Sequence, residues 1–145
     1  MCFQIVLDVR DLFRKWREDN ERKSEDIIYL WDNVLEAKVN KLGNERHLVL
    51  EQVIIAAFDC GRIEIGEDCI RTLSLEFPGS LRVQKYKAMR LEALERYDDA
   101  IVVLDDIISK DETNAAPRKR KIAILKAKGK PLEAIKELCE YLKKY

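Results

Sequence analysis

The chain has 145 residues, of which 47% are hydrophobic and 37% are charged, and its 27 basic residues balance its 27 acidic ones. This composition excludes a disordered chain and a membrane-embedded one, and the absence of net charge argues against nucleic acid or an anionic membrane as the partner. Five glycines and three prolines are too few for the many tight turns of a β-sandwich or barrel, so a mostly helical domain is favoured.

The first residues and the cysteines bear on the cellular compartment. Residues 1–8 contain no basic side chain and end on an acid, so we expect no signal peptide and a chain that stays in the cytosol. The longest apolar run, 53–58, is too short to cross a bilayer. The four cysteines form no CxxC pair and are expected to be small buried hydrophobic residues rather than disulfides.

Residues 1–46 are expected to form two helices. Apolar residues recur at helical spacing over 5–16, and the polar stretch 17–23 then breaks the pattern. A second apolar stripe runs over 27–42, which predicts one further helix that begins near Ser24 and stops at the following glycine. Both tryptophans lie on these stripes, so we expect them in the core rather than in a ligand cage.

A repeat of 34 residues runs through the rest of the chain. The small residues Gly66, Ala100 and Ala134 stand at this interval, and larger apolar residues follow each of them at matching offsets. A period of 34 is typical of the tetratricopeptide repeat, in which each unit is a pair of antiparallel helices. The sequence therefore predicts an all-α tetratricopeptide-repeat solenoid of antiparallel helix pairs, with an N-terminal helical cap over residues 1–46. The three predicted units are residues 47–80, 81–114 and 115–145.

The spacing inside the units supports this interpretation over an irregular bundle with accidental periodicity. Two helices that cross closely need small residues at the crossing. Ser80 and the pair Thr113–Asn114 are expected to cap the helices that follow them, and Pro131 is expected to open the last helix. The residues assigned to packing within the repeats are Gly66, Ala88, Ala100 and Ala134.

Several stretches resemble one known family over most of the chain from about residue 12. These stretches are RKWRE at 14–18, KLG at 41–43, EQVIIAA at 51–57, FPGS at 77–80, MRLEA at 89–93, ERYDDAI at 95–101 and RKRKIAI at 118–124. Together they resemble subunit 2 of the endoplasmic reticulum membrane protein complex, a family of tetratricopeptide-repeat subunits.

The resemblance implies a function and a location. It implies a non-catalytic scaffold that supports insertion of transmembrane segments, including tail anchors, into the endoplasmic reticulum membrane. It implies the other subunits of that complex as partners and a cytoplasmic location, peripheral on the cytosolic face of that membrane. Members of the family continue with further repeats, so we expect this chain to be a form shortened at the C-terminus. A free tetratricopeptide adaptor that binds short peptides or a protein partner is the alternative, and a decayed paralogue that folds poorly is a third option.

The third unit begins with a basic run that follows an acidic helix. Its lysines and arginines could form a solvent-exposed helix face whose charge the preceding acids balance. They could equally bind a protein partner with an acidic surface. We expect no nucleic acid, because no aromatic residues interleave with the lysines. A clamp for chaperone C-termini is disfavoured because the first helices lack asparagine. The residues assigned to partner binding are Lys85, Met89, Arg118, Lys119, Lys121 and Lys126.

The last helix is expected to leave an uncovered apolar edge. In a solenoid each unit buries its face on the next, and Ile135, Leu138 and Leu142 have no following unit. We therefore expect this edge to bind a partner or to self-associate.

The sequence predicts neither catalysis nor a cofactor. The single histidine, His47, has no neighbouring ligands in a zinc-binding pattern. Phosphate-binding glycine motifs and a nucleophile elbow are likewise missing. We therefore expect no catalytic, cofactor-binding or metal site.

Overall fold

The computed structural model describes the backbone of residues 2–145 and the side chains of residues 3–145. All regular elements in this part of the chain are helical, which confirms the all-α prediction. The chain divides into two compact units, unit 1 ending at Pro78 and unit 2 spanning Gly79–Tyr145. None of the described helices combines the length and the hydrophobicity that crossing a bilayer requires.

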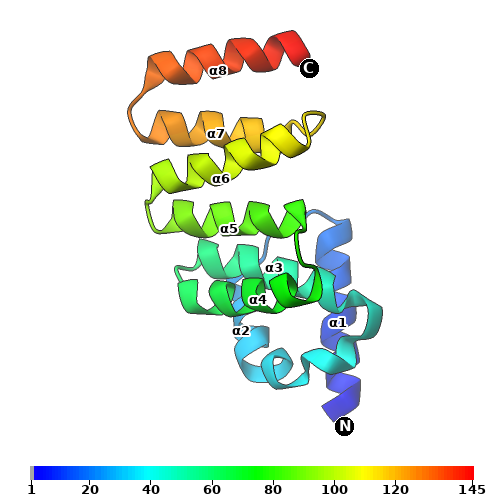
Figure 1. The fold of residues 1–145 in the computed structure, drawn as a ribbon. Coiled ribbons are helices and arrows are strands. Elements are labelled where there is room, and N and C mark those ends of the chain that lie inside the picture. Colours follow the sequence, from blue (N-terminus) through cyan, green and yellow to red (C-terminus); the bar gives the residue numbers. More distant parts are fainter. Residues whose placement is uncertain (1) are drawn as a thin grey trace. The chain divides into compact units, whose positions relative to one another are not determined.

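Unit 1 begins with the helices predicted for the N-terminal region and continues into a helix pair (Figure 1). Its α-helices are α1 (Cys2–Glu18), α2 (Ser24–Leu30), α3 (Arg46–Asp59) and α4 (Ile63–Glu76). Both α1 and α2 contact α3, which also pairs with α4. Almost every turn of α3 contributes buried residues, as is typical of a helix surrounded by others.

The prediction of a single helix after Ser24 was wrong beyond Leu30. The chain passes there into a π-helical segment, Trp31–Leu35, and then into a 3₁₀ segment, Glu36–Glu45. The backbone leaves helical geometry at Lys38 and again at Gly43, whose φ of 63° and ψ of −134° suit a residue without a Cβ. The apolar stripe of this region is still buried, so the pattern predicted burial correctly and helix type incorrectly.

The core of unit 1 is built from large side chains. Phe13, Leu35, Leu50 and Ile54 are at most 2% exposed. The two tryptophans are also buried, which confirms the expectation that they are core residues. Trp16 packs on Phe13 with ring centroids 5.6 Å apart. The core of unit 1 therefore takes large residues from α1, from α3 and from the irregular segment.

Unit 2 consists of two helix hairpins that lie side by side in chain order (Figure 1). Its helices are α5 (Leu81–Ala93), α6 (Tyr97–Lys110), α7 (Ala116–Ala127) and α8 (Pro131–Lys144). Within the unit, α6 contacts α5, α7 contacts α6 and α8 contacts α7. This arrangement confirms the prediction of antiparallel helix pairs.

The predicted helix starts of unit 2 are present, with one shift. Ser80 caps α5, because its Oγ accepts a hydrogen bond of 3.4 Å from the backbone N–H of Val83. The side chain of Asn114 accepts from the backbone N–H of Ala116 at 3.1 Å, so α7 begins one residue later than predicted. α8 opens at Pro131, as expected from its fixed φ and missing N–H.

The small residues assigned to repeat packing lie inside their helix pairs. Ala88 and Ala100 are fully buried in one cluster with Leu104, while Ala134 is buried with neighbours from α7. In unit 1 a Cβ on Gly66 would lie 2.5 Å from Cε1 of the Phe58 ring. Each pair therefore closes over a position that has little room for a larger side chain.

Candidate functional site

The basic run predicted to bind a partner lies on α7 and the turn that follows it, and several of its charges pair with carboxylates of neighbouring helices. Lys121 Nζ lies 2.9 Å from Asp105 Oδ1 on α6 and 2.9 Å from Glu137 Oε1 on α8. Burial lowers the pKa of Lys121, but the hydrogen bonds to Glu137 and Asp105 outweigh this effect and raise the pKa above its ordinary value. Lys128 pairs with Asp98 on α6. These charges hold α7 between its neighbours.

The outward face of α7 carries the rest of the predicted partner site. Lys119, Ala123 and Lys126 are exposed, and their spacing of four and three residues places them on one face of the helix. Lys119 Nζ also lies 5.8 Å from the centre of the Tyr141 ring. Arg118 is half-buried, and its Nε has no hydrogen-bond partner among the described residues. The basic stripe, defined as Lys119 and Lys126, is thus the accessible part of the predicted partner site on α7.

The two candidates on α5 differ from each other in accessibility. Lys85 is half-buried, and its Nζ lies 4.8 Å from the centre of the Tyr86 ring. Met89 is only 9% exposed and offers little surface to a partner. A binding role for either residue stays a prediction.

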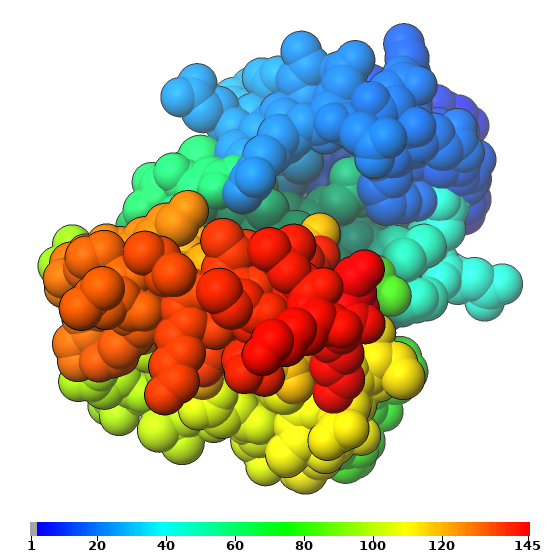
Figure 2. Space-filling view, turned by 90° about the horizontal axis from the view of Figure 1, so that it is seen from above, coloured from blue at the N-terminus to red at the C-terminus, as the bar shows by residue number. Residues whose placement is uncertain are grey.

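The three residues predicted at the C-terminal edge are exposed on α8. They belong to α8, the helix whose surface Figure 2 shows in orange to red. Leu132, which the sequence analysis did not single out, is also exposed on this helix. An open depression of about 390 Å³ lies between α6, α7 and α8, and its lining includes Asp98, Lys121 and Glu137.

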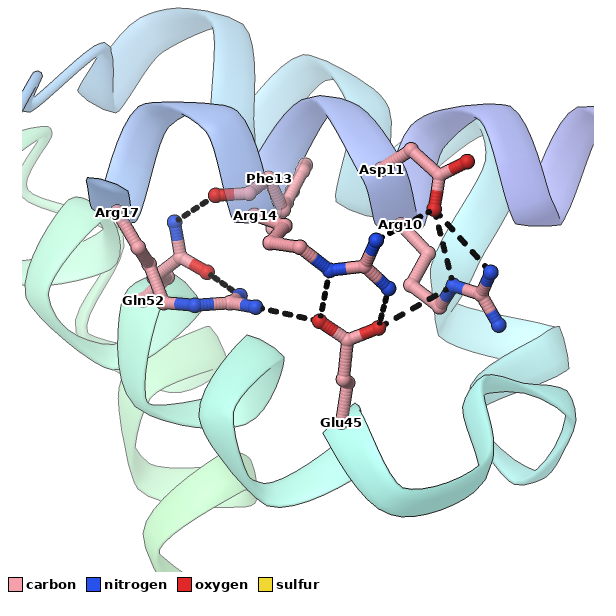
Figure 3. Close-up of polar contacts among 7 residues, drawn as sticks. All are labelled: Arg10, Asp11, Phe13, Arg14, Arg17, Glu45 and Gln52. Carbon is pink, nitrogen blue, oxygen red and sulfur yellow. Dashed lines mark hydrogen bonds and ion pairs between the residues drawn. The ribbon is translucent and has the colours of Figure 1, made fainter. Parts of the chain in front are cut away.

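Sequence analysis missed a charged cluster in unit 1, shown in Figure 3. Glu45, just before α3, accepts hydrogen bonds from Arg14 Nε at 2.8 Å and from Arg17 Nη2 at 2.7 Å. Arg10 Nε lies 3.3 Å from the same carboxylate. Gln52 on α3 donates to the backbone oxygen of Phe13 at 3.1 Å. The cluster fastens α1 to the start of α3.

The electrostatics of this cluster favour an ionised carboxylate. The hydrogen bond from Arg14 lowers the pKa of Glu45, and this effect outweighs the opposing effect of burial. The signal that could have revealed the site is the spacing of Arg10, Arg14 and Arg17, which places three guanidinium groups on one face of α1. Nothing in the sequence indicates that the partner is Glu45.

The histidine and the cysteines are the remaining side chains that could carry chemistry. His47 stacks edge-on against Phe77, with ring centroids 6.0 Å apart. No group of side chains suited to holding a metal ion occurs among the described residues.

The prediction that the cysteines are buried is confirmed for Cys69, and burial raises the pKa of its thiol to about 12. The prediction is wrong for Cys60 and Cys139, which are exposed free thiols. The fourth, Cys2, lies outside the described side chains.

Comparison with known proteins places these features in a family. No protein-family profile matches the chain. It is 49% identical over 138 residues to ER membrane protein complex subunit 2-B of Xenopus laevis. The aligned residues make up 95% of this chain and 46% of that protein. The corresponding subunit 2 of Xenopus tropicalis is 48% identical over the same lengths. The TPR repeat protein oca3 of Schizosaccharomyces pombe is 34% identical over 106 residues, 73% of this chain and 38% of that protein.

The comparisons agree with the repeat and with the resemblance. The name of the fission yeast relative fits the 34-residue period, and the two frog relatives align with nearly the whole chain. The chain spans about half the length of the curated relatives that it matches. Identity of this order over 95% of its residues shows that the chain belongs to the family of ER membrane protein complex subunit 2.

Proposed function

We propose that the chain is a non-catalytic scaffold subunit of the ER membrane protein complex, located peripherally on the cytosolic face of the membrane. There it supports the insertion of transmembrane segments, including tail anchors. The observation that carries the proposal is the 48–49% identity to proteins named as subunit 2 of this complex. A role as a scaffold is consistent with a chain built from packed helix pairs whose charges serve structural contacts.

The domain organisation belongs to the same proposal. A cap over residues 1–46 precedes repeat units at 47–80, 81–114 and 115–145. The helix pairs α3–α4, α5–α6 and α7–α8 begin within one residue of the starts of these three units, which supports the division. Each unit then contributes a rigid hairpin on which other subunits dock.

The basic stripe on α7 is the surface that we assign to an acidic partner subunit. Lys119 and Lys126 are exposed, whereas Lys121 and Lys128 are occupied by carboxylates of α6 and α8. An approaching acidic surface would meet two unneutralised ammonium groups about two helical turns apart. Such contacts on an exposed helix face contribute orientation and association rate more than affinity.

Affinity purification from cells tests the proposal. The tagged chain should recover other subunits of the complex, identified by mass spectrometry. The charge reversal Lys119→Glu/Lys126→Glu should reduce the recovery at least several-fold. The matched control Lys15→Glu/Lys41→Glu changes charge equally on exposed positions of unit 1 and should recover the subunits normally.

Two results would contradict the proposal. A folded chain that recovers none of the subunits is not a member of the complex. If it instead binds a free acidic peptide, and the Lys119→Glu/Lys126→Glu variant loses that binding, the chain is a tetratricopeptide adaptor. Circular dichroism of every variant confirms that the helices remain intact.

A further inference from the structure

A cavity of about 280 Å³ opens in unit 1 and is lined by the irregular segment 31–45, α3 and α4. The buried part of its lining is largely apolar, since Trp31, Leu50 and Cys69 are 7%, 2% and 2% exposed. Sites for small molecules typically measure about 300–1,000 Å³, so this cavity suits one long side chain better than a drug-sized ligand.

The irregular segment makes one wall of the cavity. Its backbone leaves helical geometry at Lys38, where φ is −128° and ψ is 20°, and residues on both sides of this break line the cavity. The π-helical turn that precedes the break contributes Trp31. Because π-helical turns occur frequently at functional sites, their presence beside a cavity points to a binding role for this wall.

The cavity carries a carboxylate on each of two walls. Glu36 comes from the 3₁₀ segment and Asp68 from α4, and α3 contacts both of these elements. Burial raises the pKa of the Cys69 thiol, and the negative charges of Asp68 and Glu36 raise it further. Both carboxylates therefore lie close enough to the same buried atom to act on it together.

The charge of these carboxylates is not balanced within the cavity. Glu36 is exposed and makes no hydrogen bond or ion pair with a described residue. Asp68 pairs through Oδ1 with Arg71 at 2.8 Å, but both side chains are largely exposed, and such pairs contribute little. Arg46 also lines the cavity, and its guanidinium is paired with Glu76. The cavity is therefore negatively charged and suited to a cation.

An arginine side chain fits this combination of walls best. Its apolar stem can lie on Leu50, as long basic side chains do on apolar surfaces. Its planar guanidinium presents five donors and can reach acceptors on both sides, whereas an ammonium group is a compact point charge. A carboxylate or phosphate would instead meet like charge at Glu36 and Asp68.

The rim of the cavity indicates that the arginine belongs to a protein segment. Asn40 lies exposed at the rim, and its side chain makes no hydrogen bond with a described residue. An amide side chain can donate to a peptide carbonyl and accept from a peptide N–H, so it can hold the backbone of a segment that crosses the rim. Ala37 on the same wall is exposed and small, which lets such a segment approach closely.

We propose that the cavity of unit 1 binds an arginine side chain presented by a segment of another protein, with the guanidinium held between Glu36 and Asp68. This surface differs from the basic stripe of α7, which we assign to an acidic partner. The inference does not depend on membership of the membrane complex.

Binding of short peptides to the full chain tests the proposal. The reference peptide has nine residues, glycines and serines with one central arginine, and two matched peptides carry lysine or uncharged citrulline at the centre. In nitrogen–proton correlation spectra the arginine peptide should move the indole N–H signal of Trp31. The signal of Trp16, which does not line the cavity, should stay in place. The dissociation constant should be at least fivefold lower for the arginine peptide than for the citrulline peptide, and at least twofold lower than for the lysine peptide.

Variants at the two walls separate binding from folding. Glu36→Gln/Asp68→Asn should weaken binding of the arginine peptide at least fivefold, and the melting temperature should stay within a few degrees because both side chains are exposed. The matched control Asp19→Asn/Glu25→Gln makes the same changes at exposed positions of unit 1 outside the cavity and should bind normally.

Three outcomes would overturn the proposal. If the Trp31 signal moves with none of the peptides, the cavity does not receive a side chain. Equal affinity for the arginine peptide and for either matched peptide would mean that the two carboxylates do not recognise a guanidinium group. Acetyl-arginine methylamide that binds as tightly as the arginine peptide would mean that the occupant is a free small molecule rather than a protein segment.

Discussion

Units 1 and 2 bury their helices by different means. Unit 1 gathers large side chains around α3, with Phe13, Leu50 and Ile54 fully buried, and fastens α1 to it through Glu45. Unit 2 is a row of helices in which the small residues Ala88 and Ala100 are fully buried in one cluster with Leu104, Ile107 and Ile124. The difference teaches that a repeat can reuse one pattern of small and large residues at each helix pair, whereas the irregular region of unit 1 also needs charged contacts between residues far apart in the sequence.

The largest effect on stability is expected when a large buried side chain is removed from unit 1. Ile54→Ala deletes buried methyl and methylene groups from α3 and should lower the free energy of unfolding by about 3–4 kcal/mol. Urea unfolding followed by circular dichroism measures the change. Leu75→Ala is the control, because this side chain is 80% exposed and should cost no more than about 0.5 kcal/mol. A loss from Ile54→Ala as small as this would mean that unit 1 does not depend on its central core.

The next test enlarges a small buried side chain in unit 2. Ala100→Leu forces three extra carbons into a fully buried position of α6, and it should lower the free energy of unfolding by about 2 kcal/mol. Hydrogen exchange should show that the protection lost lies mainly in α5, α6 and α7. Val102→Leu adds bulk to the same helix at an exposed position and should have no effect. Tolerance of Ala100→Leu would contradict the close packing that we assign to the repeat.

The charged cluster of unit 1 offers a smaller, pH-dependent test. Glu45→Gln keeps the shape of the side chain but removes the charge that Arg14 and Arg17 share, and it should cost about 1 kcal/mol at neutral pH. Because the pKa of Glu45 is lowered in the folded chain, the unfolded chain binds more protons and the stabilisation rises with pH. It should be complete above the ordinary glutamate pKa of about 4.3 and disappear as the pH falls through the folded value.

Thermal melting between pH 3 and pH 7 measures this dependence. The melting temperatures of the unmodified chain and of Glu45→Gln should converge toward pH 3. Glu140→Gln removes an exposed charge from unit 2 and should track the unmodified chain at every pH. A difference between the unmodified chain and Glu45→Gln that stays constant with pH would show that the carboxylate contributes through shape alone.

Unit 2 was the more predictable of the two from sequence. Its helix starts depend on local residues such as Ser80 and Pro131, and its small residues recur at a fixed interval because the same crossing is built twice. Local capping and periodicity are readable without knowing the partner of any side chain.

Unit 1 was less predictable because its decisive contacts are not periodic. An apolar stripe specifies which side chains are buried, but the same burial is achieved through the π and 3₁₀ turns that follow Leu30. Glu45 meets Arg14 and Arg17 across 31 and 28 residues of intervening chain. A sequence shows that both charges exist, but only the fold brings them together.

The smallest effect is expected from an ion pair in unit 2. Lys121→Met keeps the long apolar stem of the side chain and removes the ammonium group that joins Asp105 on α6 to Glu137 on α8. Asp105 is about half exposed, so solvent screens the interaction, and the loss should be about 0.5 kcal/mol in low salt. It should shrink in 1 M NaCl, where the screening length falls to about 3 Å.

Urea unfolding at the two salt concentrations measures this loss, with Lys126→Met as the control because that exposed lysine makes no ion pair with a described residue. The result decides how unit 2 is held together. A loss larger than that of Glu45→Gln would mean that charges rather than alanine contacts align α7 between α6 and α8. The ion pairs of Lys121 would then hold α7 in unit 2 as the ion pairs of Glu45 hold α1 in unit 1.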